Sequence, residues 1–400
     1  MLGRKVVQHP CEADPEAVGY DSGRLHVLND HIQQMIDEKM ILSGSYCLWR
    51  KGKVFADVSL GNLACEWQGR TRFLPDTFFE LQSVTKVFTA IAILKLAEDG
   101  ILYLGQPVCE WIEEFNIPDF RNITILHLLT HTSGLCALPG VLPEDERRWW
   151  EAMDENRVGE TWIPAVIQTG LQGKPGEKWI YSAVGYPLLG EILQRATGKK
   201  AEEYIREEIF LPCQMKETHW RVDAKEEWLP RYNIANETDL KMVKEYQKIG
   251  KKAMTKPSYL WWDEVPNTAG GVMSTGREMV RLGEMLLRDG YYRGKRIIGK
   301  IALSRLWTNQ VGEQVLDWCW GHPGNPVVYG AGMPISTHGS DREQLISDSV
   351  IYHEGSGACV FLVDKKEDFV AVYQTSFPKE EGWSHRAVKA TASIIWSGIR

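Results

Sequence analysis

The chain has 400 residues, of which 44% are hydrophobic and 25% charged, proportions that are typical of a globular protein and exclude a disordered, collagen-like or coiled-coil chain. Lysine and arginine number 46 against 53 aspartates and glutamates, a net charge of −7 without a long basic run, so we expect neither nucleic acid nor a membrane as a partner. One hydrophobic core seldom serves more than about 300 residues, and the length therefore predicts a composite domain or two lobes.

The first residues, MLGRKVVQHPCEADPEAVGYDSG, are charged and interrupted by proline, and they lack the apolar segment of a secretory signal. No apolar run approaches the roughly 18 residues of a membrane span. Eight cysteines are spread along the chain without a CxxC pair, which disfavours a zinc ribbon and a disulfide scaffold. We expect these cysteines to be reduced and mostly buried, in a cytoplasmic protein.

The N-terminal part predicts a helix followed by a β-hairpin. From Ser22 to Ile41, apolar residues recur at close to helical spacing, and Ser22 is placed to cap the helix. Residues 45–60 then read SYCLWRKGKVFADVSL, in which two β-rich runs flank a polar turn at residues 50–53.

Helical periodicity dominates from about Thr85 to Leu287. The segments that carry it are separated by proline and glycine, and they read VFTAIAILKLAEDG, ITILHLLTH, YPLLGEILQRATG, AEEYIREEIF and REMVRLGEMLL. Two β-rich runs follow at residues 358–363 and 369–374 around a polar turn, and a helical pattern over residues 384–399 closes the chain.

This order of elements predicts an α+β fold. Strands from both chain ends would form one antiparallel sheet flanked by helices, with a mostly helical lobe inserted between them. We expect a sheet lobe from residues 15–80 plus 288–400 and a helical lobe from residues 81–287. The functional site would lie between the two lobes.

Ser83 and Lys86 are the first candidates for catalysis. Residues three apart share a helix face, so the hydroxyl and the amine can come within hydrogen-bonding distance, and a desolvated lysine can activate a hydroxyl. The spacing alone is weak evidence, because Ser376 and Lys379 repeat it, although Pro378 disfavours a helix there. Ser83 instead precedes an apolar run, which predicts a buried helix N-terminus where backbone N–H groups favour negative charge.

Six blocks of the chain, taken together and in order, are specific where the single spacing is not. They read FFELQSVTKVFTAIAILKLAEDGIL, ITILHLLTHTSGL, KPGEKWIYSAVGYPLLGEIL, EIFLPCQMKET, TAGGVMSTGREMVRLGEMLL and IYHEGSGACVF, and they extend from about Phe78 to Phe361. This series resembles the serine β-lactamase and penicillin-binding superfamily, in particular its class C-like branch with family VIII carboxylesterases, D-stereospecific peptidases and acyltransferases.

The resemblance implies three catalytic residues. Ser83 would be the nucleophile, and Lys86 would accept its proton or orient it. Tyr181 aligns with the first residue of the family's YxN element and would, as a phenol or phenolate, carry the proton to the leaving group.

The resemblance also implies a second group of residues around the substrate. His353 and Gly355 align with the family's KTG or HxG element, and the backbone N–H groups of Ser83 and Ser356 would form the oxyanion hole. Two departures disfavour a β-lactamase or a cell-wall peptidase: the third position of YxN is Ala183, and histidine replaces lysine. We expect His353 to lie at the mouth of the site and to make the rate depend on pH between about 5 and 8.

Each assignment has a structural alternative. Ser83 could be only a helix cap, Tyr181 a core aromatic and His353 a histidine hydrogen-bonded at a strand edge. Conversely, His127 and His131 lie four apart and could bind a metal ion, but the glutamate of HExxH and a third ligand are missing, so we expect no metal site.

The chain has sixteen tryptophans, several of them in pairs. Most are expected in the core, because their rings bury large areas. The pairs at residues 149–150 and at Trp261 and Trp262 lie in segments without a helical pattern, and loops often carry binding function. We therefore expect Trp261 and Trp262 to wall an acyl or alcohol pocket.

These features predict a serine hydrolase that forms an acyl-enzyme on Ser83, needs no cofactor and acts on a small-molecule acyl substrate. The favoured activity is that of a carboxylesterase on small or aromatic esters. Three alternatives stay open: an acyltransferase, a D-amino-acid peptidase, amidase or weak β-lactamase, and a catalytically dead scaffold of the same fold. The sequence indicates no particular oligomeric state.

Overall fold

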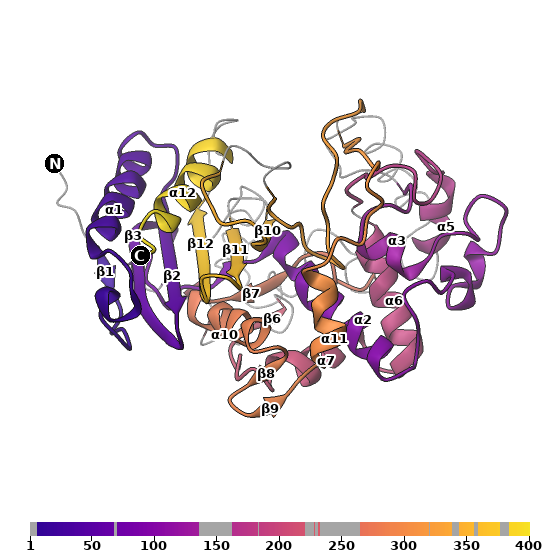
Figure 1. The fold of residues 1–400 in the computed structure, drawn as a ribbon, viewed down its shortest axis with the longest axis horizontal. Coiled ribbons are helices and arrows are strands. Elements are labelled where there is room, and N and C mark those ends of the chain that lie inside the picture. Colours follow the sequence, from indigo (N-terminus) through magenta and orange to yellow (C-terminus); the bar gives the residue numbers. More distant parts are fainter. Residues whose placement is uncertain are drawn as a thin grey trace.

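The computed structural model describes residues 6–67, 70–135, 162–182, 184–220, 228, 231–232, 265–319, 321–337, 344–355, 359–376 and 384–400. In these parts of the chain, seven strands form one antiparallel sheet in the order β1-β3-β2-β12-β11-β10, with β4 paired to β3 (Figure 1). The strands are β1 (Val7–Gln8), β2 (Ser43–Arg50), β3 (Lys53–Trp67), β4 (Arg70–Arg72), β10 (Ile351–Gly355), β11 (Cys359–Asp364) and β12 (Phe369–Ser376). The predicted α+β fold, with one sheet built from both chain ends, is confirmed.

The two ends of the chain meet in the middle of the sheet, where β2 pairs with β12. Both predicted hairpins are present, since β2 pairs with β3 and β11 pairs with β12. Strand β2 is buried along its whole length. Because successive side chains of a strand point to opposite faces, its residues enter two separate cores, with Tyr46 and Leu48 on one face and Cys47 and Trp49 on the other.

Helices cover both faces of this sheet (Figure 1). The two terminal helices, α1 (Ser22–Asp37) and α12 (Thr391–Trp396), pack on the face of Tyr46. On the other face lies α10 (Gly276–Leu287), where a Cβ atom at Gly283 would come within 2.5 Å of a methyl group of Val370.

The start of α1 differs from the prediction in one detail. Asp21, rather than Ser22, is the N-cap residue, because its carboxylate accepts a hydrogen bond of 3.0 Å from the Gly23 N–H. Ser22 is the first residue of the helix. The carboxylate of Asp21, at the N-cap, also complements the positive end of the helix dipole.

The helical part of the chain is organised around α2 (Thr85–Glu98), whose residues from Thr85 to Leu96 are all buried. A helix that is apolar on all sides belongs inside a core rather than at a surface. The other described α-helices around it are α3 (Ile125–Leu129), α5 (Trp162–Gln168), α6 (Gly185–Thr197), α7 (Ala201–Ile205) and α11 (Lys300–Leu303). Of these, α6, α7 and α11 contact α2.

The division into two lobes stays a prediction. Helices on either side of the predicted boundary at residue 287 pack against the other lobe. Helix α10 precedes the boundary but packs on the sheet, whereas α11 follows it but packs against α2. One continuous core also joins side chains of the sheet, such as Val372, to side chains of α2, such as Phe88.

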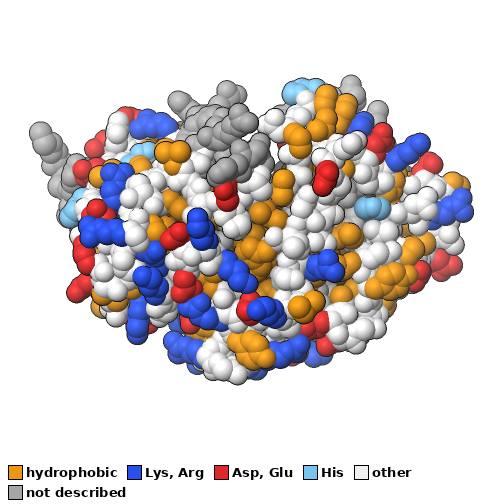
Figure 2. All heavy atoms as spheres, in the orientation of Figure 1, with side chains coloured by type: hydrophobic (Ala, Val, Ile, Leu, Met, Phe, Trp, Pro, Cys, Tyr) orange, Lys and Arg blue, Asp and Glu red, His pale blue; other side chains and the backbone are white. Residues whose placement is uncertain are grey.

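The described surface carries side chains of both charges, which Figure 2 shows spread over the visible face. No helix in the described residues has the length and apolar character needed to cross a membrane. Six described cysteines are free, and four of these are buried: Cys47, Cys213, Cys319 and Cys359.

Candidate active site

Ser83 lies in a short 3-10 helix, η2 (Gln82–Val84), directly before α2. A small sheet holds the chain just ahead of it: β5 (Phe79–Glu80) pairs with β7 (Val272–Ser274), and the Leu81 N–H donates to the Val272 carbonyl at 2.8 Å. Gln82 has a φ of 47°, which is uncommon for a residue other than glycine. Strained backbone of this kind is often found at functional sites.

The Lys86 amine contacts the Ser83 hydroxyl, as the spacing predicted. Nζ lies 3.1 Å from Ser83 Oγ, and it also donates to the Ala269 carbonyl at 2.9 Å. Lys86 is only 2% exposed. Burial lowers the pKa of Lys86 to about 7, so a large fraction of the amine is neutral at physiological pH and can accept a proton.

The carbonyl that binds Lys86 follows a residue, Thr268, that is anchored to both α2 and α6. Thr89 on α2 donates to the Thr268 carbonyl at 2.8 Å, and the Thr268 hydroxyl donates to the Tyr186 carbonyl at 2.8 Å. Sequence reasoning identified the TAGGVMS block but missed the role of Ala269, because a backbone carbonyl carries no signal of residue type.

Tyr181 approaches the same pair from the segment before α6. The Ser83 hydroxyl is near enough to lower the pKa of Tyr181, and Lys86 Nζ lies 5.1 Å from the centroid of the Tyr181 ring. Burial raises the pKa of Tyr181, and the Ser83 hydroxyl only partly opposes this rise. The side chain is therefore a phenol at neutral pH and can donate a proton, which disfavours the phenolate alternative.

His353, on β10, is buried beside these residues. It is 3% exposed, and its ring centroid lies 6.4 Å from that of Tyr181. Burial and the nearby Lys86 lower the pKa of His353 to about 3. The expectation of a histidine at the mouth of the site that titrates between about pH 5 and 8 is therefore wrong, because His353 is enclosed and neutral.

The hydrogen bond of His353 shows which of its two ring nitrogens carries the proton. Nδ1 lies 2.9 Å from the Glu354 carbonyl, which can only accept, so Nδ1 carries the proton and Nε2 carries a lone pair. Nε2 is buried and has no hydrogen-bond partner among the described residues.

Gly355, at the end of β10, packs against the turn that carries Ser83. A Cβ atom at this position would lie 2.4 Å from the Leu81 carbonyl oxygen and 2.9 Å from Gln82 Cβ. Only glycine permits so close an approach. The structure thus explains Gly355 by packing, and its contact with substrate stays a prediction.

The other predicted site residues fall outside the described residues. These are Ser356, expected in the oxyanion hole, Ala183, and the tryptophans Trp261 and Trp262.

The two histidines considered as metal ligands have other roles. Helix α3 ends at Leu129, so His131 does not share a helix face with His127. His127 Nδ1 accepts from the Thr124 N–H at 3.2 Å and closes a capping box, while His131 Nδ1 accepts from the Ser182 N–H at 3.1 Å. Within the described ranges, no group of three or more histidine, cysteine or acidic side chains could hold a metal ion.

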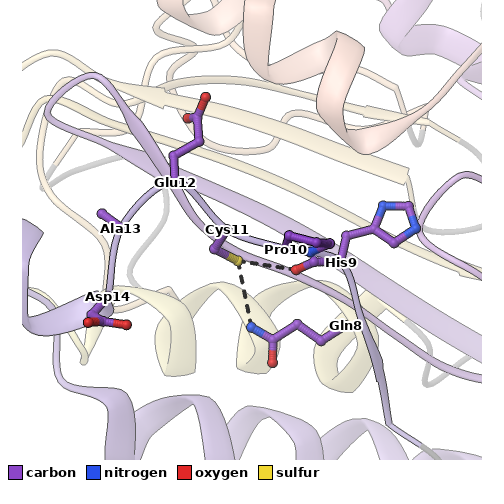
Figure 3. A pocket seen from close by; sticks show the side chains of 7 residues that line it. All are labelled: Gln8, His9, Pro10, Cys11, Glu12, Ala13 and Asp14. Atoms are coloured by element: carbon purple, nitrogen blue, oxygen red, sulfur yellow. Dashed lines mark hydrogen bonds between the residues drawn. The ribbon is translucent and has the colours of Figure 1, made fainter.

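A separate cavity of about 580 Å³ lies at the opposite edge of the sheet. The segment from Gln8 to Asp14 lines it, with the Cys11 thiol between the Gln8 amide and the His9 carbonyl (Figure 3). Because β1 and β10 are the two edges of the sheet, this cavity is not part of the Ser83 site.

Comparison with known proteins gives the family and the fold of this chain. Residues 28–391 match the family model named Beta-lactamase. Penicillin-binding protein 4* of Bacillus subtilis is 33% identical over 196 residues, which cover 47% of this chain and 41% of that protein. Protein Rv1367c of Mycobacterium tuberculosis is 24% identical over 303 residues, which cover 71% of each chain. This chain therefore spans about two fifths of the length of the Bacillus relative.

Several solved structures share the fold. EstCE1, a hydrolase with promiscuous acyltransferase activity, has a TM-score of 0.71 at 19% identity and covers 94% of this chain and 99% of its own. The simvastatin synthase LovD of Aspergillus terreus has a TM-score of 0.72 at 17% identity, covering 94% and 98%. A class C beta-lactamase has a TM-score of 0.70 at 16% identity, covering 95% and 97%. At these identities the likeness concerns the fold alone.

The packing of Gly355 predicts that a methyl group there displaces the turn of Ser83. We expect Gly355→Ala to slow the labelling of Ser83 by a fluorophosphonate about 10-fold or more, since small displacements of a nucleophile have large effects on its rate. Gly105→Ala is the matched control, because its Cβ would meet only the Tyr103 ring at 4.0 Å. Equal labelling rates in both variants would contradict the packing argument.

Proposed function

Because the chain belongs to the beta-lactamase family, whose members are serine hydrolases, we propose that it hydrolyses carboxylic esters through an acyl-enzyme on Ser83. The observation that carries the proposal is the 3.1 Å contact between Ser83 Oγ and the buried amine of Lys86. A serine hydroxyl is a weak nucleophile by itself, and an adjacent base of matched pKa activates it.

Acylation uses the three side chains in turn. Neutral Lys86 accepts the hydroxyl proton as Ser83 Oγ attacks the ester carbonyl carbon. The tetrahedral intermediate then collapses, the bond to the alcohol oxygen breaks, and Tyr181 donates its proton to that oxygen. The proton held on Lys86 restores the phenol, and the alcohol leaves the acyl group on Ser83.

Deacylation repeats these steps with water in place of the alcohol. The water loses a proton to Lys86, the base, as it attacks the acyl carbonyl carbon. The bond to Ser83 Oγ then breaks, and this oxygen takes up a proton, which restores the free enzyme. In both acylation and deacylation, negative charge develops on the carbonyl oxygen of the substrate. The backbone N–H groups of Ser83 and Ser356 are the proposed hydrogen-bond donors to this oxygen.

Two features favour neutral esters over β-lactams. The third position of the tyrosine element is Ala183, which brings no amide to bind a substrate amide. His353 is neutral and therefore offers no positive charge to the carboxylate that penicillins and cephalosporins carry. Uncharged esters with small or aromatic acyl groups avoid both deficits.

Acylation predicts one covalent adduct on Ser83. After a fluorophosphonate or a slowly hydrolysed ester, intact-mass analysis should show a single addition, and peptide mapping should place it on Ser83. Ser83→Ala should show no adduct and lose turnover, while Ser376→Ala, which removes the serine of the second SxxK sequence, should behave as the wild type. An adduct on Ser376, or turnover by Ser83→Ala, would contradict the assignment.

The pKa of Lys86 predicts an acidic limb in the pH profile. Only the neutral amine accepts a proton, so kcat/KM for an uncharged ester should rise with pH through a midpoint near 7 and then level off. Lys86→Ala should lower kcat by about 100-fold or more. His353→Gln is the control, and its midpoint should stay near 7 because His353 titrates near 3. A midpoint that moves with His353→Gln would instead assign the limb to that histidine.

The substrate preference predicts faster turnover of esters than of β-lactams. The purified protein should give a higher kcat/KM with p-nitrophenyl acetate than with nitrocefin or benzylpenicillin. Slow β-lactam hydrolysis agrees with the proposal, since a missing polar contact costs at most several kcal/mol of discrimination. Higher β-lactam than ester turnover would overturn the preference. Adding an alcohol and measuring the new ester would show how the acyl-enzyme divides between alcohol and water.

A further inference from the structure

We propose that His131 is a positioning residue, which holds Tyr181 at the Ser83 hydroxyl. The proposal rests on the proposed function in one respect, namely that Tyr181 donates the proton to the leaving group. His131 makes no hydrogen bond with Ser83 or Lys86 in the described structure. From the sequence, its spacing from His127 suggested only a possible metal ligand.

The backbone around Tyr181 requires such support. Tyr181 precedes α6, which begins at Gly185, and it lies in a segment of irregular backbone. The N–H groups of this segment therefore find no partner in a helix, and each needs an acceptor from elsewhere in the fold.

His131 supplies two of these acceptors from a single residue. Its carbonyl accepts from the Ile180 N–H at 2.9 Å, and its Nδ1 accepts from the Ser182 N–H at 3.1 Å. The N–H groups of the two residues that flank Tyr181 are thus bound by one histidine. The N–H of Tyr181 itself donates to the Cys319 thiol at 3.2 Å.

The imidazole also supports the phenol ring directly. The ring centroids of His131 and Tyr181 lie 4.2 Å apart with an interplanar angle of 32°. Behind the imidazole lie Tyr186, at 5.3 Å and 33°, and Tyr329, at 5.7 Å in an edge contact. The imidazole is packed between the Tyr181 ring and these two rings and is hydrogen-bonded through Nδ1, so it holds the phenol ring in place.

A left-handed backbone at His131 makes this arrangement possible. The residue follows the end of α3 and has a φ of 58°. This conformation lets the carbonyl and the side chain of one residue reach two peptides that are separated by Tyr181. Asparagine adopts the same conformation more readily than most residues, which makes it useful as a substitution.

The imidazole is suited to remain an acceptor throughout the working pH range. It is fully buried, and burial, with Lys86 and His353 nearby, keeps the pKa of His131 well below its ordinary value. Nδ1 accepts a hydrogen bond, so the proton resides on Nε2, which has no partner among the described residues.

The test compares two leaving groups in four proteins: wild type, His131→Leu, Tyr181→Phe and the double variant. Phenolate is more basic than p-nitrophenolate and depends more on a proton donor as it leaves. His131→Leu should therefore lower kcat/KM, which reports acylation, about 10-fold or more for phenyl acetate, and less for p-nitrophenyl acetate. In the Tyr181→Phe background it should cause little further loss, because the residue that it positions is already disabled.

Two further variants keep the test decisive if His131→Leu folds poorly. His131→Asn places an oxygen close to the position of Nδ1 and tolerates the positive φ, so it should recover most of the phenyl acetate activity. His131→Gln carries its amide beyond that position and should not. Circular dichroism and urea unfolding of each variant would separate loss of the fold from loss of positioning.

The outcomes distinguish this proposal from the proposed function. If losses in the double variant simply multiply, or if both leaving groups suffer equally, His131 does not act through Tyr181 and the proposal is overturned. The same holds if His131→Leu keeps full activity while Ser83→Ala and Tyr181→Phe lose it, and then the proposed function stands. Full activity in Tyr181→Phe, by contrast, would overturn the proton-donating role of Tyr181 and the positioning proposal with it.

Discussion

The buried amine of Lys86 is the constraint on which the site depends. It lies 3.1 Å from Ser83 Oγ in surroundings dry enough to bring its pKa to about 7. A charged ammonium could not take the serine proton, so the fold must keep water away from this one side chain. Helix α2 does so by being buried from Thr85 to Leu96, and the Ala269 carbonyl satisfies the amine without supplying a charge.

This arrangement has a cost in stability that depends on pH. The folded protein holds Lys86 with a lowered pKa, while the unfolded chain keeps the ordinary value of 10.5, so the unfolded state binds more protons between these values. The destabilisation is complete below about pH 7, decreases as the pH rises and disappears above the ordinary pKa. The large core that joins the sheet to α2 supplies the stability that offsets this cost.

The fold also explains why segments far apart in sequence meet at one serine. The turn of Ser83 lies between the small sheet, which binds it through Leu81, and the edge strand β10, which touches it at Gly355. Because β10 belongs to the large sheet, the position of the nucleophile is tied to the sheet that both chain ends build. The segment that carries Tyr181 then approaches from the helical side and completes the site.

The sequence by itself determined the features that depend on neighbours along the chain. Alternation and helical periodicity predicted the sheet and α2, and the spacing of three residues, taken with the six sequence blocks, predicted the contact between Lys86 and Ser83. Tertiary structure alone decided what depends on distant segments: the burial that lowers the pKa values of Lys86, His353 and His131, and the binding of Lys86 by the Ala269 carbonyl. His131 shows the difference, since its spacing from His127 suggested a metal site, while the end of α3 and a left-handed backbone turn it toward Tyr181. Periodicity reports which side of an element is apolar, but solvent exclusion and contacts between distant segments arise only when the elements pack.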